Sequence, residues 1–100
     1  MKKIYVEING PRPPYYNLPN ELWPGVGFDS DGNSHDPESK EWTELSITNR
    51  ENESLRINID PVNENPLVFV VESDTPELTI FAANWLVSHA AGKILYNYTA

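Results

Sequence analysis

The sequence contains no cysteine, and this absence excludes disulfide bonds, thiolate metal sites and a cysteine nucleophile. It also lacks an apolar run of the roughly 18 residues that a membrane span requires. Residues 1–10 carry two lysines but no apolar stretch behind them, so we expect no signal peptide. Together these absences predict a cytoplasmic protein.

Basic residues are scarce, because seven Lys and Arg stand against fifteen Asp and Glu, for a net charge of -8. Residues 29–41 contain five acidic residues and one lysine, and residues 61–80 contain four acidic residues and no basic one. This balance argues against direct binding to nucleic acid or to an anionic membrane, both of which require a basic face. It favours attraction to a basic partner.

Catalytic motifs are also missing, since neither a Gly-x-Ser-x-Gly turn nor a glycine-rich phosphate loop occurs. We therefore predict that the chain is not an enzyme and uses no cofactor. Asp29, Asp31 and Asn33 match the start of an EF-hand calcium loop. Ser34 stands where that loop requires glycine and Lys40 where it requires glutamate. We predict no metal site, and a calcium-binding module stays only as an alternative.

The length of 100 residues predicts one domain that spans the whole chain, 1–100. Apolar residues alternate with polar ones over residues 3–8, 43–48 and 55–59, which indicates half-buried strands. The last two of these are expected to pair as a hairpin. Residues 67–71 are continuously apolar, which is typical of a central strand covered on both faces.

One strong helix signal follows this strand. Thr75 is a suitable N-cap, Pro76 suits the first helical position, and Glu77 complements the helix dipole. Gly92 stands where a left-handed C-terminal cap would end the helix, and residues 94–98 suggest a last strand. We predict an α+β fold with an antiparallel or mixed sheet of about five strands and one C-terminal helix, in the order β-loop-β-β-β-α-β.

Five prolines between residues 11 and 24 argue against regular helix or central strand in that segment. Residues 10–41 are therefore predicted to form an ordered, proline-rich loop that lies on the domain, with a polar turn over residues 29–41. Aromatic residues flank this acidic turn, as in protein interfaces where aromatic anchors stand beside charges. The predicted partner-binding residues are Tyr16, Trp23, Asp29, Asp31, Asp36, Glu38, Glu41, Trp42 and Glu44.

The order of elements over residues 42–96 resembles one pattern of small bacterial immunity proteins, including those of contact-dependent inhibition. The pattern comprises a strand led by tryptophan, a second strand, a central apolar strand, an apolar helix, then glycine and a short strand. The matching segments are Trp42-Thr43-Glu44-Leu45, Leu55-Arg56-Ile57, residues 67–71, residues 81–86, and Gly92-Lys93-Ile94. The resemblance implies that the protein neutralises a toxin by stoichiometric binding. Many such toxins are nucleases with basic active sites.

We therefore expect a protein that neutralises a basic protein partner, as an immunity protein or antitoxin does. The main alternative is a self-associating structural or accessory protein, of the kind found in phages and mobile elements. A homodimer would then form through the apolar helix or an open sheet edge.

Overall fold

The computed structural model describes residues 2–31, 39 and 41–98, and within them the chain forms six strands and two helices. The α+β prediction is confirmed, and the described residues contain one strand and one helix more than it specified. In chain order the elements are β1 (Lys2–Glu7), α1 (Asn17–Leu22), β2 (Phe28–Asp31), β3 (Leu45–Asn49), β4 (Arg56–Glu64), β5 (Leu67–Ser73), α2 (Pro76–His89) and β6 (Lys93–Leu95).

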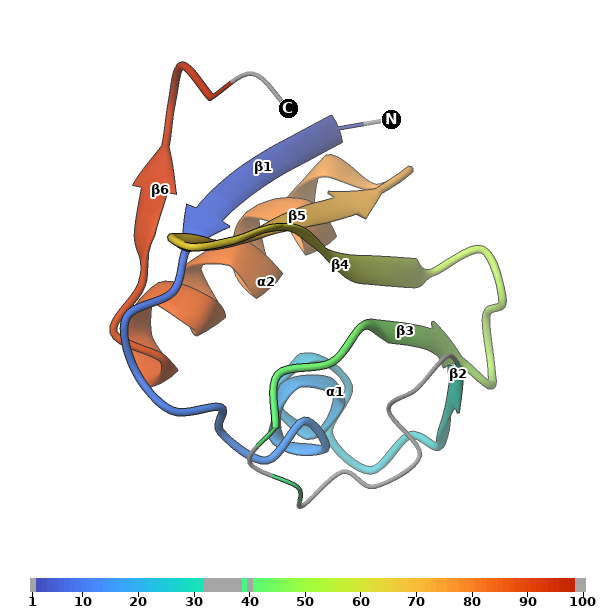
Figure 1. Ribbon diagram of the computed structural model, residues 1–100. Helices are drawn as coiled ribbons and strands as arrows, with labels where there is room; N and C mark the ends of the chain where they lie inside the picture. The colour runs from blue at the N-terminus through green and yellow to red at the C-terminus, as the bar shows by residue number, and fades with distance from the viewer. Residues whose placement is uncertain (1, 32–38, 40, 99–100) are drawn as a thin grey trace.

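The six strands form one antiparallel sheet with the order β2-β3-β4-β5-β1-β6. The predicted hairpin is present, because β3 pairs directly with β4. The first strand, β1, lies between β5 and β6 from the end of the chain. Figure 1 shows both helices on the same side of this sheet, so the molecule has two layers.

The core lies between the sheet and the helices. Alternation in each strand turns one set of side chains toward the helices, while α2 buries the side chains that face the sheet. Each fully buried large apolar side chain stabilises the fold by about 1.5–3 kcal/mol. The buried set includes Val6, Leu45, Ile47, Ile57, Ile59, Phe69, Val71, Ala82, Trp85 and Leu86.

Helix α1 lies inside the segment that its prolines predicted to be irregular, so this part of the prediction is wrong. Pro19 is the third residue of α1, where a backbone N–H has no partner within the helix. The proline therefore costs no hydrogen bond there, and its carbonyl accepts one from the N–H of Trp23 at 2.8 Å. Leu18 is fully buried in the core, which fixes this short helix against the domain.

Strand β4 continues through Asp60-Pro61, although the sequence suggested that these residues end it. Pro61 lies opposite Phe69 of β5, and the register shifts between Pro61 and Asn63. On its other side, β4 pairs with β3 only as far as Ile59, opposite Leu45. Proline is tolerated here because this stretch of β4 is an edge with a bulge, where a missing N–H breaks no ladder.

Helix α2 begins as predicted, with Thr75 as N-cap and Pro76 and Glu77 in its first turn. Its end differs, because Ala91 and not Gly92 has a positive φ, of 49°. Gly92 serves close packing instead, since a Cβ there would lie 3.0 Å from Val6 Cγ1. The last strand, β6, is also shorter than the predicted 94–98.

Strand β2 replaces the start of the polar turn predicted over residues 29–41. It pairs with β3 and forms one edge of the sheet, with Phe28 opposite Asn49 and Asp31 opposite Ser46. The polar residues Asp29 and Ser30 are exposed, as charged and polar side chains are expected to be on an edge strand. Neither described helix is long and apolar enough to cross a membrane.

Candidate functional site

Every second side chain of each strand points to the face of the sheet that lies away from the helices. The opposite parity holds the core, as Leu45, Ile47, Ile57 and Ile59 show. On this face, the half over β6, β1 and β5 has apolar and aromatic side chains at its centre, with Lys3, Glu7 and Lys93 beside them, and we call it the apolar half. The half over β3, β4 and β5 is polar and mainly acidic, with Arg56 as its cation. We call the whole face of the sheet away from the helices the uncovered face.

The apolar half of the uncovered face is centred on Val68 and Val70 of β5. Both valines are buried, and β5 is a central strand as predicted, but the described helices cover only its other face and not both faces. Tyr5 lies opposite Val70 on one side and opposite Leu95 on the other. Its ring packs against that of Tyr98, with 4.9 Å between the ring centroids. Aromatic and aliphatic side chains on neighbouring strands thus pack against one another across this half of the face.

The acidic half is formed by Glu44, Asp60 and Glu72, which we call the acidic row. Asp60 is in β4, Glu72 is in the neighbouring β5, and Glu44 immediately precedes β3, which pairs with β4 on the other side. All three side chains are half-buried. Their neighbours on this face include Ser46 and Asn58, which are joined by a 2.7 Å hydrogen bond from the serine hydroxyl to the amide oxygen.

The carboxylates of the acidic row affect one another. Partial burial raises the pKa of Asp60, and the negative charges of Glu44 and Glu72 raise it further. The ionised form of Asp60 is therefore less favourable in the folded protein than in the unfolded chain. The fold retains a local electrostatic cost on this face.

Few cations compensate this charge. Lys3 approaches Glu72 at 3.9 Å, and Lys93 approaches Glu7 at 3.7 Å, with both lysines more than half exposed. Exposed pairs of this length contribute little stability. Within residues 2–31, 39 and 41–98, neither Glu44 nor Asp60 forms an ion pair. Arg56 also lies on the parity of Asn58 and Asp60, where its Nε donates to Asn58 Oδ1 at 3.3 Å. Within the part of the chain that the structure describes, the acidic row is thus compensated only in part, by Lys3 at Glu72.

The aromatic residues predicted as partner anchors lie mostly in the core. Trp23 is only 8% exposed and belongs to the central hydrophobic cluster. The half-buried Trp42 packs against Phe69 with 5.3 Å between centroids, and its Nε1 donates to the carbonyl of Gly10. Tyr16 is half-buried at the N-cap of α1. These aromatics attach the proline-rich segment to the sheet and are not part of the uncovered face.

The predicted acidic residues are not gathered in one place. Asp29 accepts a 2.8 Å hydrogen bond from Arg50 Nε and forms an ion pair with that residue at the β2 edge. The backbone of Asp31 ends β2, and Glu41 is exposed. Asp36 and Glu38 lie outside the described residues. Of the nine predicted residues, Glu44 alone is placed by the structure in the acidic row.

Sequence reasoning missed Asp60 and Glu72, although the period-two pattern contains a signal for both. Asp60 follows Arg56 and Asn58 on the polar parity of β4, opposite in sense to Ile57 and Ile59. Glu72 continues the parity of Val68 and Val70. Extending each alternation by one residue would have assigned both carboxylates to the same face.

We expect Asp60→Asn to raise the free energy of unfolding at pH 7 by about 0.2–1 kcal/mol, because it removes like-charge repulsion between neighbouring strands. Since the pKa of Asp60 is higher in the folded chain, the wild type is penalised where this group is ionised. The advantage of the variant should therefore shrink on acidification and vanish below the ordinary value of 3.8. Urea unfolding at several pH values measures this.

The matched control for this prediction is Glu53→Gln, which neutralises an exposed carboxylate in the turn between β3 and β4. It should leave the free energy of unfolding within about 0.5 kcal/mol of the wild type. A loss of stability in Asp60→Asn at pH 7 would contradict the account of the acidic row.

Among the described residues, no three or more Asp, Glu or His side chains lie close enough to hold a metal ion. Comparison with protein-family models, with curated proteins and with solved structures finds no match to this chain. The interpretation of the uncovered face therefore depends on its chemistry.

Proposed function

We propose that this chain is a cytoplasmic binding protein that neutralises a basic protein partner by forming a stoichiometric complex, as an immunity protein does for a bacterial toxin. The observation that carries the proposal is the acidic row of Glu44, Asp60 and Glu72 on the uncovered face. Among the described residues only Glu72 of the row has an ion-pair partner, Lys3, and the row lies beside an apolar half with Tyr5 and Leu95. An apolar centre next to charges is the usual composition of a protein interface.

Electrostatics supports a basic partner over other ligands. The net charge of -8 steers a basic protein toward this molecule and repels nucleic acid and anionic membranes. Besides burial, the charges of Glu44 and Glu72 raise the pKa of Asp60, and Lys or Arg side chains of the partner would offset this repulsion. If the partner is a nuclease toxin, this row would occupy the place of its phosphate substrate.

The proposal is tested by co-expressing the full chain with the products of the genes next to its own, followed by affinity purification and calorimetry. We expect a 1:1 complex whose association rate falls at least about tenfold between 50 and 300 mM salt. Replacing the row by Glu44→Gln, Asp60→Asn and Glu72→Gln together should weaken binding about 100-fold, because three charge pairs are lost at once.

A matched control removes three other carboxylates by Glu51→Gln, Glu53→Gln and Glu64→Gln. These side chains are exposed, and the change in net charge is the same. The control should weaken binding less than about fivefold, through long-range steering alone. Equal losses in both triple variants, or the absence of any stoichiometric complex, would refute the proposal.

A further inference from the structure

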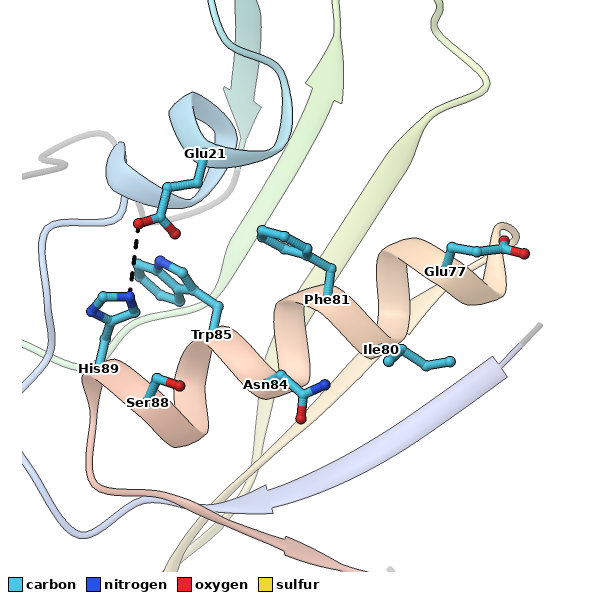
Figure 2. A pocket seen from close by; sticks show the side chains of 8 residues that line it. All are labelled: Glu21, Glu77, Ile80, Phe81, Asn84, Trp85, Ser88 and His89. Atoms are coloured by element: carbon cyan, nitrogen blue, oxygen red, sulfur yellow. Dashed lines mark ion pairs between the residues drawn. The ribbon is translucent and has the colours of Figure 1, made fainter.

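A groove runs along the outer side of α2, in the helix layer and so on the other side of the sheet from the acidic row. Its volume is about 460 Å³. Glu77, Phe81, Trp85 and His89 line it at steps of four residues, and Glu21 of α1 adds to the wall. Ile80, Asn84 and Ser88 form a second row with the same step. Figure 2 shows Phe81 and Trp85 directed to the side of α1, and Ile80 and Asn84 directed away from it.

The two rows are parallel ridges, the first about three turns or roughly 18 Å long and the second about two turns or roughly 12 Å long. Ridges of this type on one helix accept the ridge of another helix between them. A partner helix that presents apolar residues at i, i+3, i+4 and i+7 fits this shape, as in other helix-in-groove complexes. The groove therefore suits a helix of about three turns.

Each ridge of the groove carries an apolar side chain that is open to solvent. Ile80 and Phe81 are adjacent in α2 and are 43% and 41% exposed, which is high for large apolar side chains on a helix packed against a sheet. The indole N–H of Trp85 is buried and has no acceptor within the described residues. A buried N–H without an acceptor costs about 1–3 kcal/mol. The exposed apolar side chains and the unpaired N–H both lower the stability of the folded chain, so this surface of α2 is not explained by folding alone.

The charge at the rim selects the occupant. Glu77 lies at one end, and Glu21 lies at the other, where it pairs with His89 at 3.8 Å. Neither Lys nor Arg is among the residues that line the groove. A second copy of this chain would bring -8 against -8, whereas a helix with Lys or Arg beside its apolar ridge would complement both ends.

We infer that the groove between the two ridges of α2 binds an amphipathic helix of a partner protein that carries basic residues beside its apolar face. Ile80 and Phe81 contact the apolar ridge of that helix, and Glu21 and Glu77 contact its basic flanks. This inference does not depend on the proposed function, because it concerns a different surface and is tested without the natural partner.

The test uses a display library of 14-residue helical peptides, with Lys and Arg at the polar positions and varied apolar residues at i, i+3, i+4 and i+7. The full chain is the bait, and selected peptides are labelled and titrated by fluorescence anisotropy. We expect binders that Phe81→Asp weakens at least about tenfold and Glu77→Lys at least about threefold. Versions of the same peptides with Glu in place of Lys and Arg should not bind.

Val62→Asp is the matched control, because Val62 is 36% exposed on β4, away from the groove. It should change the dissociation constants less than about twofold. Circular dichroism verifies that each variant folds, and Ile80→Asp replaces Phe81→Asp if the latter does not fold. Failure to recover binders, or equal loss with Val62→Asp, overturns the inference. A concentration-dependent dimer in light scattering that Phe81→Asp abolishes assigns the groove to a second copy and overturns it as well.

Discussion

Replacing Tyr15 with alanine is expected to lower the free energy of unfolding by about 3–5 kcal/mol, the cost of removing a large aromatic side chain from a core. Tyr15 is 1% exposed, and its hydroxyl donates to the carbonyl of Thr43 at 2.5 Å. Its ring meets that of Trp42 edge to face at 6.3 Å, and the guanidinium carbon of Arg12 lies 4.1 Å from its centroid. One side chain thus joins the proline-rich segment to the strand side of the core.

Two further variants separate the contributions of Tyr15. Tyr15→Phe keeps the ring and loses the hydroxyl, with its hydrogen bonds to the carbonyl of Thr43 and to Arg12, so a loss of about 1–2 kcal/mol is expected. Burial raises the pKa of the Tyr15 phenol well above its ordinary value, so the hydroxyl remains a donor at neutral pH. Tyr16→Ala changes a half-buried neighbour and should cost less than about 1.5 kcal/mol. These values follow from urea unfolding monitored by circular dichroism, and a loss under 1 kcal/mol in Tyr15→Ala would contradict this role.

The variant Gly10→Ala is expected to lower the free energy of unfolding by about 1–3 kcal/mol, because the added methyl group has no space. A Cβ at this position would lie 2.8 Å from the carbonyl oxygen of Ala90. That oxygen also accepts the backbone hydrogen bond from Gly10 N at 2.8 Å, and the carbonyl of Gly10 accepts from Trp42 Nε1. Relief of the clash would therefore disturb the junction of β1, α2 and the aromatic cluster.

Gly27→Ala is the control for this prediction. The nearest atoms to a Cβ at Gly27 belong to the side chain of Arg50, at 3.1 Å and beyond. This side chain is exposed and long, so it can move at little cost, and the change should stay within about 0.5 kcal/mol. The free energies of unfolding of both variants are measured by thermal or urea unfolding. Equal destabilisation would show that crowding at Gly10 does not cause the loss of stability in Gly10→Ala.

Local patterns in the sequence predicted the elements whose signals are local. The alternation around Ile57 and Ile59, the apolar run of β5 and the capping residues before α2 each depend on neighbours within a few positions. Helix α1 was missed because prolines argued against it, and the penalty disappears only at a position such as that of Pro19 in the first turn. The burial of Trp23 and Trp42 could likewise not be predicted from the sequence, since an aromatic residue beside a charged turn is compatible with both an interface and a core.

The candidate site was predicted in sign but not in place. An excess of carboxylates predicted an anionic surface, and Glu44 was among the residues named. The acidic row depends on strand order, which brings Asp60 and Glu72 beside Glu44 from segments separated in the chain. No periodicity within one segment contains that information.

The central position of β1 also has a consequence for how the molecule assembles. Lys2 lies opposite Ser73, and Tyr5 lies between Val70 and Leu95, so β1 gains both of its neighbours only after β6 has been made. Contacts between such distant parts of a chain slow folding, because a long loop must close before they form. During synthesis the apolar side chains of Ile4, Val6 and Ile8 therefore have no neighbouring strands until β5 and β6 have left the ribosome. The order in which the strands are made is not the order in which the sheet closes.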